Sequence, residues 1–245
     1  MLRLTYLSIF AAAAAMFMVP GAAKAGAVCG PGSHWVDTCA GGTYDFSSTS
    51  TVAISLDLDR NGSLETTIPF LQFSGITQVF LGVGQNNSDP HSIQTELYNL
   101  LETNPATGAT LRAGDGTPDD TNDGPLYSPG SIVEQAGNPA LANSFFDVFF
   151  ELTIPDGNTP LVLTNHAPMQ VECVGLASAP PQQCSYNFLN APLNLFEGDV
   201  VRGELLPTPA GFAHHVVTPT PEPATMFLLG GALCCVAGLR RRKRN

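Results

Sequence analysis

Side chains that carry oxygen recur at alternate positions of one short stretch of the sequence, residues 57–65. Its first, third and fifth positions are Asp, Asp and Asn and its sixth is glycine, as in the first half of an EF-hand calcium loop. The twelfth position is Ile68 where an EF-hand has a bidentate glutamate, and strand-like residues flank the stretch. A full EF-hand is therefore excluded, and a calcium-stabilised turn between two strands remains. The candidate ligands are Asp57, Asp59, Asn61, Ser63 and Glu65.

The same stretch has an interpretation that needs no ion, because Asn61-Gly62 is a preferred pair for a type I′ hairpin turn. A second acidic loop, residues 115–124, carries four carboxylates that repel one another unless they are solvated or bridged by a cation. The sequence therefore establishes no cofactor; calcium is the one candidate, against a plain turn at 57–65 and a solvated loop at 115–124, which is favoured there.

Residues that could perform catalysis are scarce. His34 and Asp37 stand three positions apart and could form a general base, but no nucleophile accompanies them, and the segment also fits simple packing of Trp35. His214-His215 falls in a segment predicted as a linker, which would give a metal no rigid support. The sequence has no G-x-S-x-G, H-E-x-x-H or G-x-x-x-x-G-K-S/T motif. It assigns no catalytic residue and favours a protein without enzymatic activity.

Four of the six cysteines lie in the central part of the chain, at positions 29, 39, 173 and 184. Three pairings exist for four cysteines, and the local pairs Cys29–Cys39 and Cys173–Cys184 are favoured because each closes a short loop. Neither pair has the spacing of a zinc site. Disulfides are compatible with a protein that leaves the reducing cytoplasm.

Strand signals dominate the interior of the sequence, where alternating or short apolar segments are separated by Gly, Pro, Asn and Asp. The pattern predicts an all-β exported domain, residues 26–205, built as an antiparallel β-sandwich. Residues 91–102 fit a helix or a strand, and the neighbouring segments favour a strand, whereas a short helix is predicted over 132–142. Prolines predict an extended linker over 206–223. The predicted strands are residues 51–58, 64–70, 76–81, 145–154, 161–163, 169–174, 186–189 and 200–205.

Charge is distributed unevenly along the chain. The net charge is −11, but residues 26–220 contain three basic and 20 acidic residues, a net charge of −17. Such a surface repels nucleic-acid phosphates, which argues against a nucleic-acid partner, and attracts divalent cations. Residues 1–25 predict a signal peptide, with Arg3 before an apolar run and Ala23-Lys24-Ala25 as the cleavage site. The acidic domain is therefore expected to be exported.

Three elements follow one another in residues 221–244. Pro221-Glu222-Pro223 precedes an apolar stretch, 224–239, and a run of five basic residues. The apolar stretch would rise about 24 Å as a helix, close to the ~30 Å hydrocarbon core of a membrane. The basic tail, 240–245, is expected to stay on the cytoplasmic side. The arrangement predicts a single transmembrane helix that leaves the acidic domain outside.

These elements resemble the PEP-CTERM sorting signal of exported bacterial proteins, in residues Pro221, Glu222, Pro223, Arg240, Arg241 and Arg242. The resemblance implies an exosortase as partner and the inner membrane as a transient anchor before processing. It implies a final place in the cell envelope, at the cell surface or in the extracellular matrix, in company with exopolysaccharide and biofilm formation. The prediction is an exosortase-sorted, non-enzymatic envelope or matrix protein.

Two alternatives remain open for the exported domain. One is a secreted hydrolase that acts on polysaccharide, and the other is a glycan- or ice-binding module. A flat threonine-rich or aromatic face would favour binding, whereas a cleft with two convergent carboxylates would favour hydrolysis.

Overall fold

The structure is a computed structural model that describes residues 29–85, 90–118, 124–157, 159–179, 184–190, 192–207 and 214–219. By its internal contacts, Gly26–Thr220 forms one compact unit. The predicted signal peptide, sorting motif, transmembrane helix and basic tail lie outside the described residues. Within the ranges given above, no helix is long and apolar enough to cross a membrane.

All regular elements of the described residues are β-strands, as the alternating sequence pattern predicted. Every pairing between them is antiparallel. The strands are β1 Gly42–Leu56, β2 Thr66–Leu81, β3 Ser92–Thr103, β4 Thr110–Ala113, β5 Pro129–Gln135, β6 Asn138–Val148, β7 Phe150–Ile154, β8 Leu161–Thr164, β9 Met169–Leu176, β10 Cys184–Phe188, β11 Leu193–Glu197, β12 Val200–Leu206 and β13 His214–Pro219.

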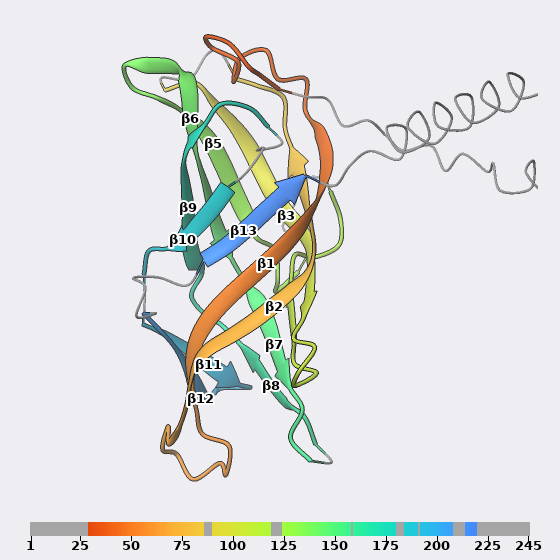
Figure 1. Ribbon diagram of the computed structural model, residues 1–245, viewed down its shortest axis with the longest axis vertical. Helices are drawn as coiled ribbons and strands as arrows, with labels where there is room; N and C mark the ends of the chain where they lie inside the picture. Colours follow the sequence, from red (N-terminus) through yellow and green to blue (C-terminus); the bar gives the residue numbers. More distant parts are fainter. Residues whose placement is uncertain are drawn as a thin grey trace, which may run out of the picture. The chain divides into compact units, whose positions relative to one another are not determined.

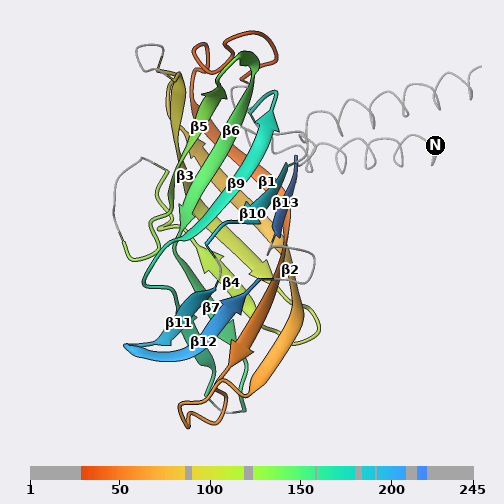
Figure 2. The ribbon, with the colours of Figure 1, turned by 90° about the vertical axis from the view of Figure 1, so that its left-hand side faces the viewer.

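These strands form one sheet that closes on itself twice. Their order is β12-β11-β8-β7-β4-β3-β2-β1-β13-β10-β9-β6-β5, and the additional pairings β12–β1 and β3–β5 join strands from distant places in that order. The first ring consists of β1, β2, β3, β4, β7, β8, β11 and β12, and the second ring of β1, β2, β3, β5, β6, β9, β10 and β13. The long strands β1 and β2 run through both rings (Figures 1 and 2).

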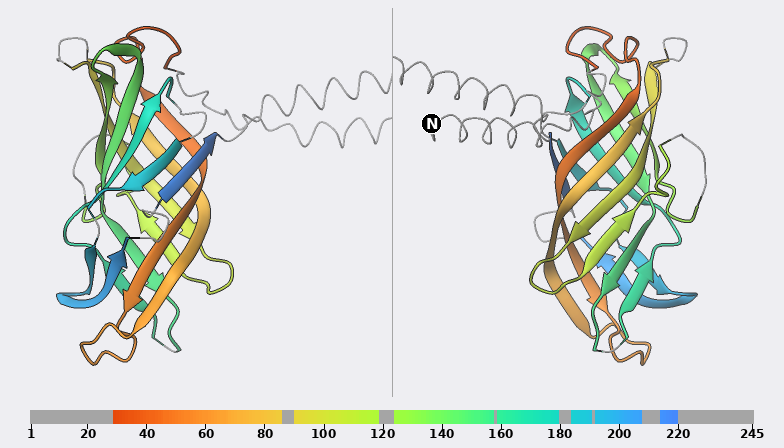
Figure 3. Two further views of the ribbon diagram at one scale, coloured as in Figure 1. Left: turned by 60° about the vertical axis from the view of Figure 1, so that its left-hand side comes forward. Right: turned by 90° about the vertical axis from the view of Figure 1, so that its right-hand side faces the viewer.

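The burial pattern of β1 shows how the sequence builds the interior of the rings. Tyr44, Phe46, Ser48, Ser50 and Val52 are buried and alternate with more exposed residues. Successive side chains of a strand point to opposite faces, so the buried set faces inward. The buried apolar residues of the described strands, except Ala53, belong to a single cluster. The strands wrap around this common core (Figure 3).

The chain passes from the second ring to the first at Phe149, where β6 ends and β7 begins. Two buried side chains bond the backbone at this break. The Ser128 hydroxyl accepts a hydrogen bond from the Phe149 amide at 3.0 Å. The Asn165 side chain accepts one from the Phe150 amide at 2.7 Å and donates one to the Val148 carbonyl at 2.8 Å. Ser128 and Asn165 therefore replace ladder hydrogen bonds that the break removes.

The closed sheet corrects the predicted sandwich, because the described strands form one sheet and not two sheets that face each other. Both architectures have the same period-two alternation, and the closing pairs join residues far apart in sequence. The two-residue turn at Asn61-Gly62 is not formed either, since the register pairs Leu56 with Thr66 and the loop spans residues 57–65.

The helix predicted over residues 132–142 is wrong. These residues form the end of β5, a turn and the start of β6, and Gly137 has a φ of 82° in the turn. Glycine adopts this conformation without a steric penalty, so it forms the turn of a hairpin. Residues 91–102 lie almost entirely in β3, as their neighbours favoured. Within the predicted linker, residues 214–219 instead form β13, which pairs with β1 and β10.

Candidate functional site

The closed sheet holds a cavity of about 70 Å³ that is lined mostly by strands of the second ring, with β4 and β7 of the first ring also contributing. Side chains without a hydrogen-bonding N–H or O–H group make up most of its wall, and the exceptions are two serines, one threonine and two tyrosines. The lining residues are Tyr44, Phe46, Ser50, Thr77, Val79, Leu81, Leu97, Leu100, Leu111, Ala113, Ile132, Ser144, Phe146, Val148, Phe150, Met169, Val171, Leu176, Ala179 and Tyr186. Because little of this wall can form hydrogen bonds, the cavity suits an apolar ligand.

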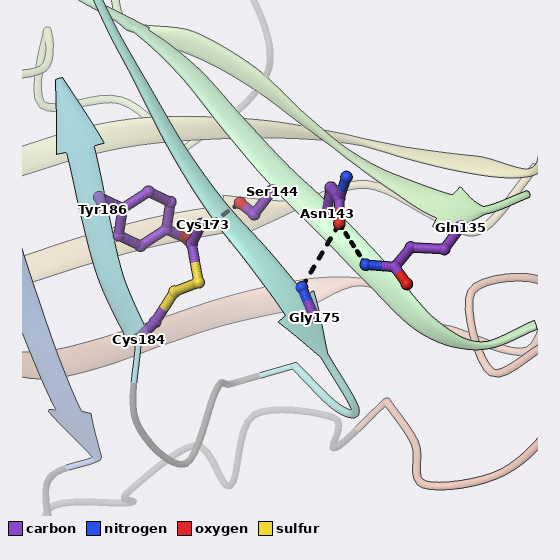
Figure 4. The surroundings of a disulfide bond; sticks show 7 residues. All are labelled: Gln135, Asn143, Ser144, Cys173, Gly175, Cys184 and Tyr186. Carbon is purple, nitrogen blue, oxygen red and sulfur yellow. Dashed lines mark hydrogen bonds between the residues drawn. A yellow bond between two sulfur atoms is a disulfide. The ribbon is translucent and has the colours of Figure 1, made fainter. Parts of the chain in front are cut away.

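Two buried tyrosines supply hydroxyl groups to the wall. The Tyr186 hydroxyl donates to Ser144 Oγ at 2.9 Å (Figure 4). Its ring meets the Phe146 ring edge-on, with the ring centres 5.7 Å apart. Burial raises the pKa of Tyr44 and of Tyr186 to about 12. Both phenols therefore stay protonated near neutral pH and can donate hydrogen bonds.

A fully buried carboxyl group, Glu102 on β3, lies behind this wall. Ser48 and Ser50 of β1 hydrogen-bond to it, and Thr77 Oγ1 donates to Ser48 Oγ at 2.8 Å. Burial raises the pKa of Glu102, and the hydrogen bonds from the two serines oppose that rise. Ser50 and Thr77 line the cavity, whereas Glu102 and Ser48 do not. The carboxyl group therefore influences the cavity only through these hydroxyls.

Both predicted disulfides are present, Cys29–Cys39 and Cys173–Cys184. Cys173 lies on β9 and Cys184 on β10, so their bond joins two strands of the cavity wall beside Tyr186 (Figure 4). Cys29–Cys39 closes the loop that precedes β1. The two bonds therefore constrain the second ring and the loop that enters it.

Asp57, the first predicted calcium ligand, is fully buried at the base of loop 57–65. Its carboxylate accepts hydrogen bonds from the backbone amides of Asn61 and Gly62, both at 2.9 Å, and forms an ion pair with Arg202 at 2.5 Å. Burial acts to raise the pKa of Asp57, but Arg202 and the two amides together hold it below its ordinary value. The Arg202 guanidinium thus supplies beside Asp57 the positive charge that a bound cation would supply.

The other predicted calcium ligands also bond within the loop. Asp59 accepts a hydrogen bond from the Asn61 side-chain amide at 2.8 Å, and Asn61 Oδ1 accepts one from the Ser63 backbone amide at 2.8 Å. Glu65 Oε1 accepts one from a backbone amide at 3.2 Å. One oxygen each of Asp57, Asp59 and Glu65 nevertheless lies within 4.8 Å of the others. The loop is held by its own hydrogen bonds, which favours the interpretation as a turn that needs no ion, and the calcium site stays a hypothesis.

Other residues singled out in the sequence are only partly described. In the acidic loop 115–124, Asp115 accepts a hydrogen bond from the Thr117 amide at 2.8 Å, and residues 119–123 lie outside the described residues. The backbones of His214 and His215 pair with β1 and β10. The sorting residues also lie outside the described part of the chain: Pro221, Glu222, Pro223, Arg240, Arg241 and Arg242.

His34 and Asp37, the pair considered as a general base, lie beside two residues that sequence reasoning missed, His91 and Glu134. His91 immediately precedes β3 and Glu134 lies near the end of β5. The Glu134 amide donates a hydrogen bond to the His91 carbonyl at 2.9 Å. Only the pairing of β3 with β5 makes these residues neighbours, so no local sequence signal could have grouped them.

An open groove lies on the first ring, between the segment after β8 and strands β11 and β12. The rings of His166 and Phe196 stack there with their centres 4.0 Å apart and their planes 2° from parallel. Asn194 and Glu204 add polar groups. Glu204 is the one carboxylate among the lining residues, whereas glycoside hydrolysis ordinarily uses a pair.

Comparison with known proteins relates the fold and one segment of the chain to others. No match was found among curated proteins. A solved structure of similar fold is DynF from the dynemicin biosynthesis pathway of Micromonospora chersina, with a TM-score of 0.55 and 16% sequence identity over 83% of this chain and 89% of that chain. At this identity the likeness extends to the fold alone. The family model of the PEP-CTERM protein-sorting motif matches residues 219–244. The chain therefore carries a PEP-CTERM protein-sorting motif, which implies export and sorting to the cell envelope by an exosortase.

Proposed function

We propose that the protein is an exported binding protein that holds a small apolar molecule inside its second ring. The observation that carries the proposal is the cavity in a closed sheet, whose wall is almost entirely hydrocarbon. The residues that line it include no histidine, cysteine or carboxylate, so the wall offers no general base. These features support binding in preference to catalysis.

The size of the cavity and its hydroxyl groups define the class of ligand. A volume of about 70 Å³ is roughly half that of the ~150 Å³ engineered cavity that binds benzene or xenon in another protein. It accommodates a few heavy atoms or the end of an alkyl chain. Ser50, Thr77 and Tyr186 also line the cavity. The hydroxyls of Thr77 and Tyr186 already donate to Ser48 and Ser144, so they retain acceptor capacity for a ligand, which suits an O–H donor. An aliphatic alcohol combines both properties.

A single methionine makes this proposal directly testable. Met169 lines the cavity and is the only methionine between residues 26 and 223. We expect the resonance of its ¹³C-labelled methyl group to shift saturably when the purified, signal-free protein is titrated with aliphatic alcohols of increasing length. Binding should strengthen with each added methylene, by up to about 0.8 kcal/mol, until the cavity is full.

Two substitutions on β9 provide the matched controls. Val171→Phe fills the cavity and should abolish the shift, because Val171 lines it. Val174→Phe adds the same volume at a side chain that is 64% exposed and should leave binding unchanged. Equal binding by the two variants, or no saturable shift with any alcohol, would rule out the cavity as the binding site.

We also propose that exosortase processing at Pro221-Glu222-Pro223 releases the exported domain from a transient anchor at residues 224–239. The match of the sorting motif to residues 219–244 supports this route. The final place would be the cell surface or extracellular matrix, in contact with exopolysaccharide. A binding protein in a biofilm matrix would retain small apolar molecules near the cell.

The groove on the first ring supports a second candidate function, glycan binding at the surface. The stacked rings of His166 and Phe196 offer an aromatic surface, and Asn194 and Glu204 offer hydrogen-bonding groups beside it. Co-sedimentation with purified exopolysaccharide tests this candidate. Phe196→Ala should weaken co-sedimentation and Val171→Phe should not, whereas equal retention of all three proteins would eliminate the groove as the site.

A further inference from the structure

Four side chains that can bind transition metals meet where loop 29–39 reaches β3 and β5. His34 Nδ1 lies 3.0 Å from Glu134 Oε2, and the same carboxylate oxygen lies 3.8 Å from His91 Nδ1. His91 Nδ1 is also 2.8 Å from Asp37 Oδ1. One ligand atom each of His34, Asp37 and His91 lies within 4.8 Å of the others. Imidazole nitrogens and carboxylate oxygens thus converge on one small volume.

The contact between Asp37 and His91 has an unusual geometry. Although Asp37 Oδ1 and His91 Nδ1 are only 2.8 Å apart, neither atom makes a hydrogen bond in the described part of the chain, and both atoms are shielded from solvent. Buried polar atoms are ordinarily hydrogen-bonded. Asp37 Oδ1 and His91 Nδ1 are close but not aligned for a hydrogen bond with each other. Two ligands of one metal ion have this arrangement, because both atoms point at the ion.

The backbone holds this group in place from three separate segments. Trp35 and Val36 are buried in the core, which leaves the flanking His34 and Asp37 at the surface of the loop. His34 has a φ of 57°, in the left-handed region, and its amide donates to the Pro139 carbonyl at 2.8 Å. The Cys29–Cys39 disulfide closes the same loop. His91 and Glu134 are fixed by the β3–β5 pairing, so all four ligands rest on constrained backbone.

We infer that His34, Asp37, His91 and Glu134 form a binding site for a divalent first-row transition-metal ion, for which Zn²⁺ is the suitable probe. A tetrahedral ion with bonds of about 2.0–2.1 Å places its ligand atoms roughly 3.3 Å apart. The measured separations of 2.8, 3.0 and 3.8 Å span that value. Two carboxylates balance the charge of the ion. Histidine nitrogens select against Ca²⁺ and Mg²⁺, which take oxygen ligands.

Such an ion would tie loop 29–39 to the sheet. The loop carries Trp35 into the core beside the second ring, and Trp35 is the only tryptophan of the chain. Its emission therefore reports the site, because the proposed ligand His34 precedes it directly and the proposed ligand Asp37 follows two positions later. We expect Co²⁺, which takes zinc sites, to quench Trp35 emission at one ion per chain and to show the ligand-field absorption of a nitrogen–oxygen site.

The direct test is titration of tag-free, chelator-treated protein with Zn²⁺, Ca²⁺ and Mg²⁺ by calorimetry. One Zn²⁺ should bind per chain with far higher affinity than either other ion. His91→Gln and Glu134→Gln should each weaken Zn²⁺ binding at least ~10-fold, the effect seen even for residues that only support a metal ligand. His166→Gln, which removes a histidine on the first ring, should leave the affinity unchanged.

Several results would overturn the inference. These are the absence of saturable Zn²⁺ binding to the unaltered protein, equal affinity for Ca²⁺, and Zn²⁺ affinity that both variants retain. Far-ultraviolet circular dichroism establishes whether each variant is folded. If both variants fail to fold, the Co²⁺ absorption and Trp35 quenching of the unaltered protein decide the question, since a simple ion-pair network would produce neither.

Discussion

Asn165→Ala should be among the more destabilising single substitutions in the sheet. The Asn165 side chain is 5% exposed and makes three hydrogen bonds, with the Phe150 amide at 2.7 Å and with the Val148 and Ala167 carbonyls at 2.8 Å each. Alanine leaves the amide and the Val148 carbonyl at the β6–β7 break without this partner. A buried polar group left unsatisfied costs about 1–3 kcal/mol, so the two backbone groups together give an expected loss of about 4 kcal/mol.

This loss is a large fraction of the 5–15 kcal/mol that stabilises a typical domain. With a urea dependence of about 2 kcal/mol per molar, the unfolding midpoint should fall by about 2 M. Asn99→Ala is the matched control, because Asn99 is exposed and its side chain donates a hydrogen bond to the Gln78 side chain. It should change stability by less than about 0.5 kcal/mol. A loss below about 1 kcal/mol for Asn165→Ala would mean that water hydrogen-bonds the backbone groups at the β6–β7 break as well as Asn165 does.

Three further predictions concern other parts of the chain. The intact mass of the mature protein should correspond to an end near Glu222, and a chain that still carries residues 240–245 in cells with active exosortase would contradict processing there. Ca²⁺ and Mg²⁺ should raise the melting temperature equally, and Asp59→Ala should not change this response, because Arg202 already pairs with Asp57. A rise that is specific to Ca²⁺ and that Asp59→Ala removes would identify a calcium site instead. The Glu102→Gln variant should become more stable relative to the unaltered protein as pH rises. Burial raises the folded-state pKa of Glu102 above its ordinary 4.5. The stabilising contribution of protonated Glu102 is therefore complete below pH 4.5 and is lost as pH rises through the folded-state pKa. Urea midpoints across a pH series measure this, and a gap that stays constant with pH would refute it.

Most strands could be predicted because their signal is local. Period-two alternation and short apolar runs located most of the strands, but β4 and β11 were not predicted, and residues of β5 and β13 were assigned to a helix and a linker. Residues 64–70 and 76–81 were predicted as separate strands, whereas the single strand β2 continues from Thr66 to Leu81. Gly75 pairs with Glu102, and a Cβ there would collide with the Leu101 carbonyl. The close approach of β3 requires a glycine at position 75, and the chain makes no turn there.

The features of the candidate sites also differ in whether they depend on local sequence or on long-range contacts. The disulfides Cys29–Cys39 and Cys173–Cys184 were predictable because each pair is near in sequence. The cavity and the group around His91 were not, because both depend on the closing pair β3–β5 and on contacts between distant segments. In loop 57–65 the spacing of the oxygen-bearing side chains was visible in the sequence. Arg202, whose guanidinium pairs with Asp57, lies 145 residues away and was not.

The position of β1 in both rings has a consequence for how the chain is made. One edge of β1 pairs with β2, which follows it directly, but its other edge pairs with β12 and β13, where Ala53 meets Leu206 and Phe46 meets Pro219. Synthesis proceeds from the N-terminus, so this second edge waits until nearly the whole domain has emerged. An unpaired strand edge is a template for aggregation, and long-range closure is slow. The second edge of β1 therefore stays open until β12 and β13 are available, and a chain truncated before residue 200 would keep that edge unpaired.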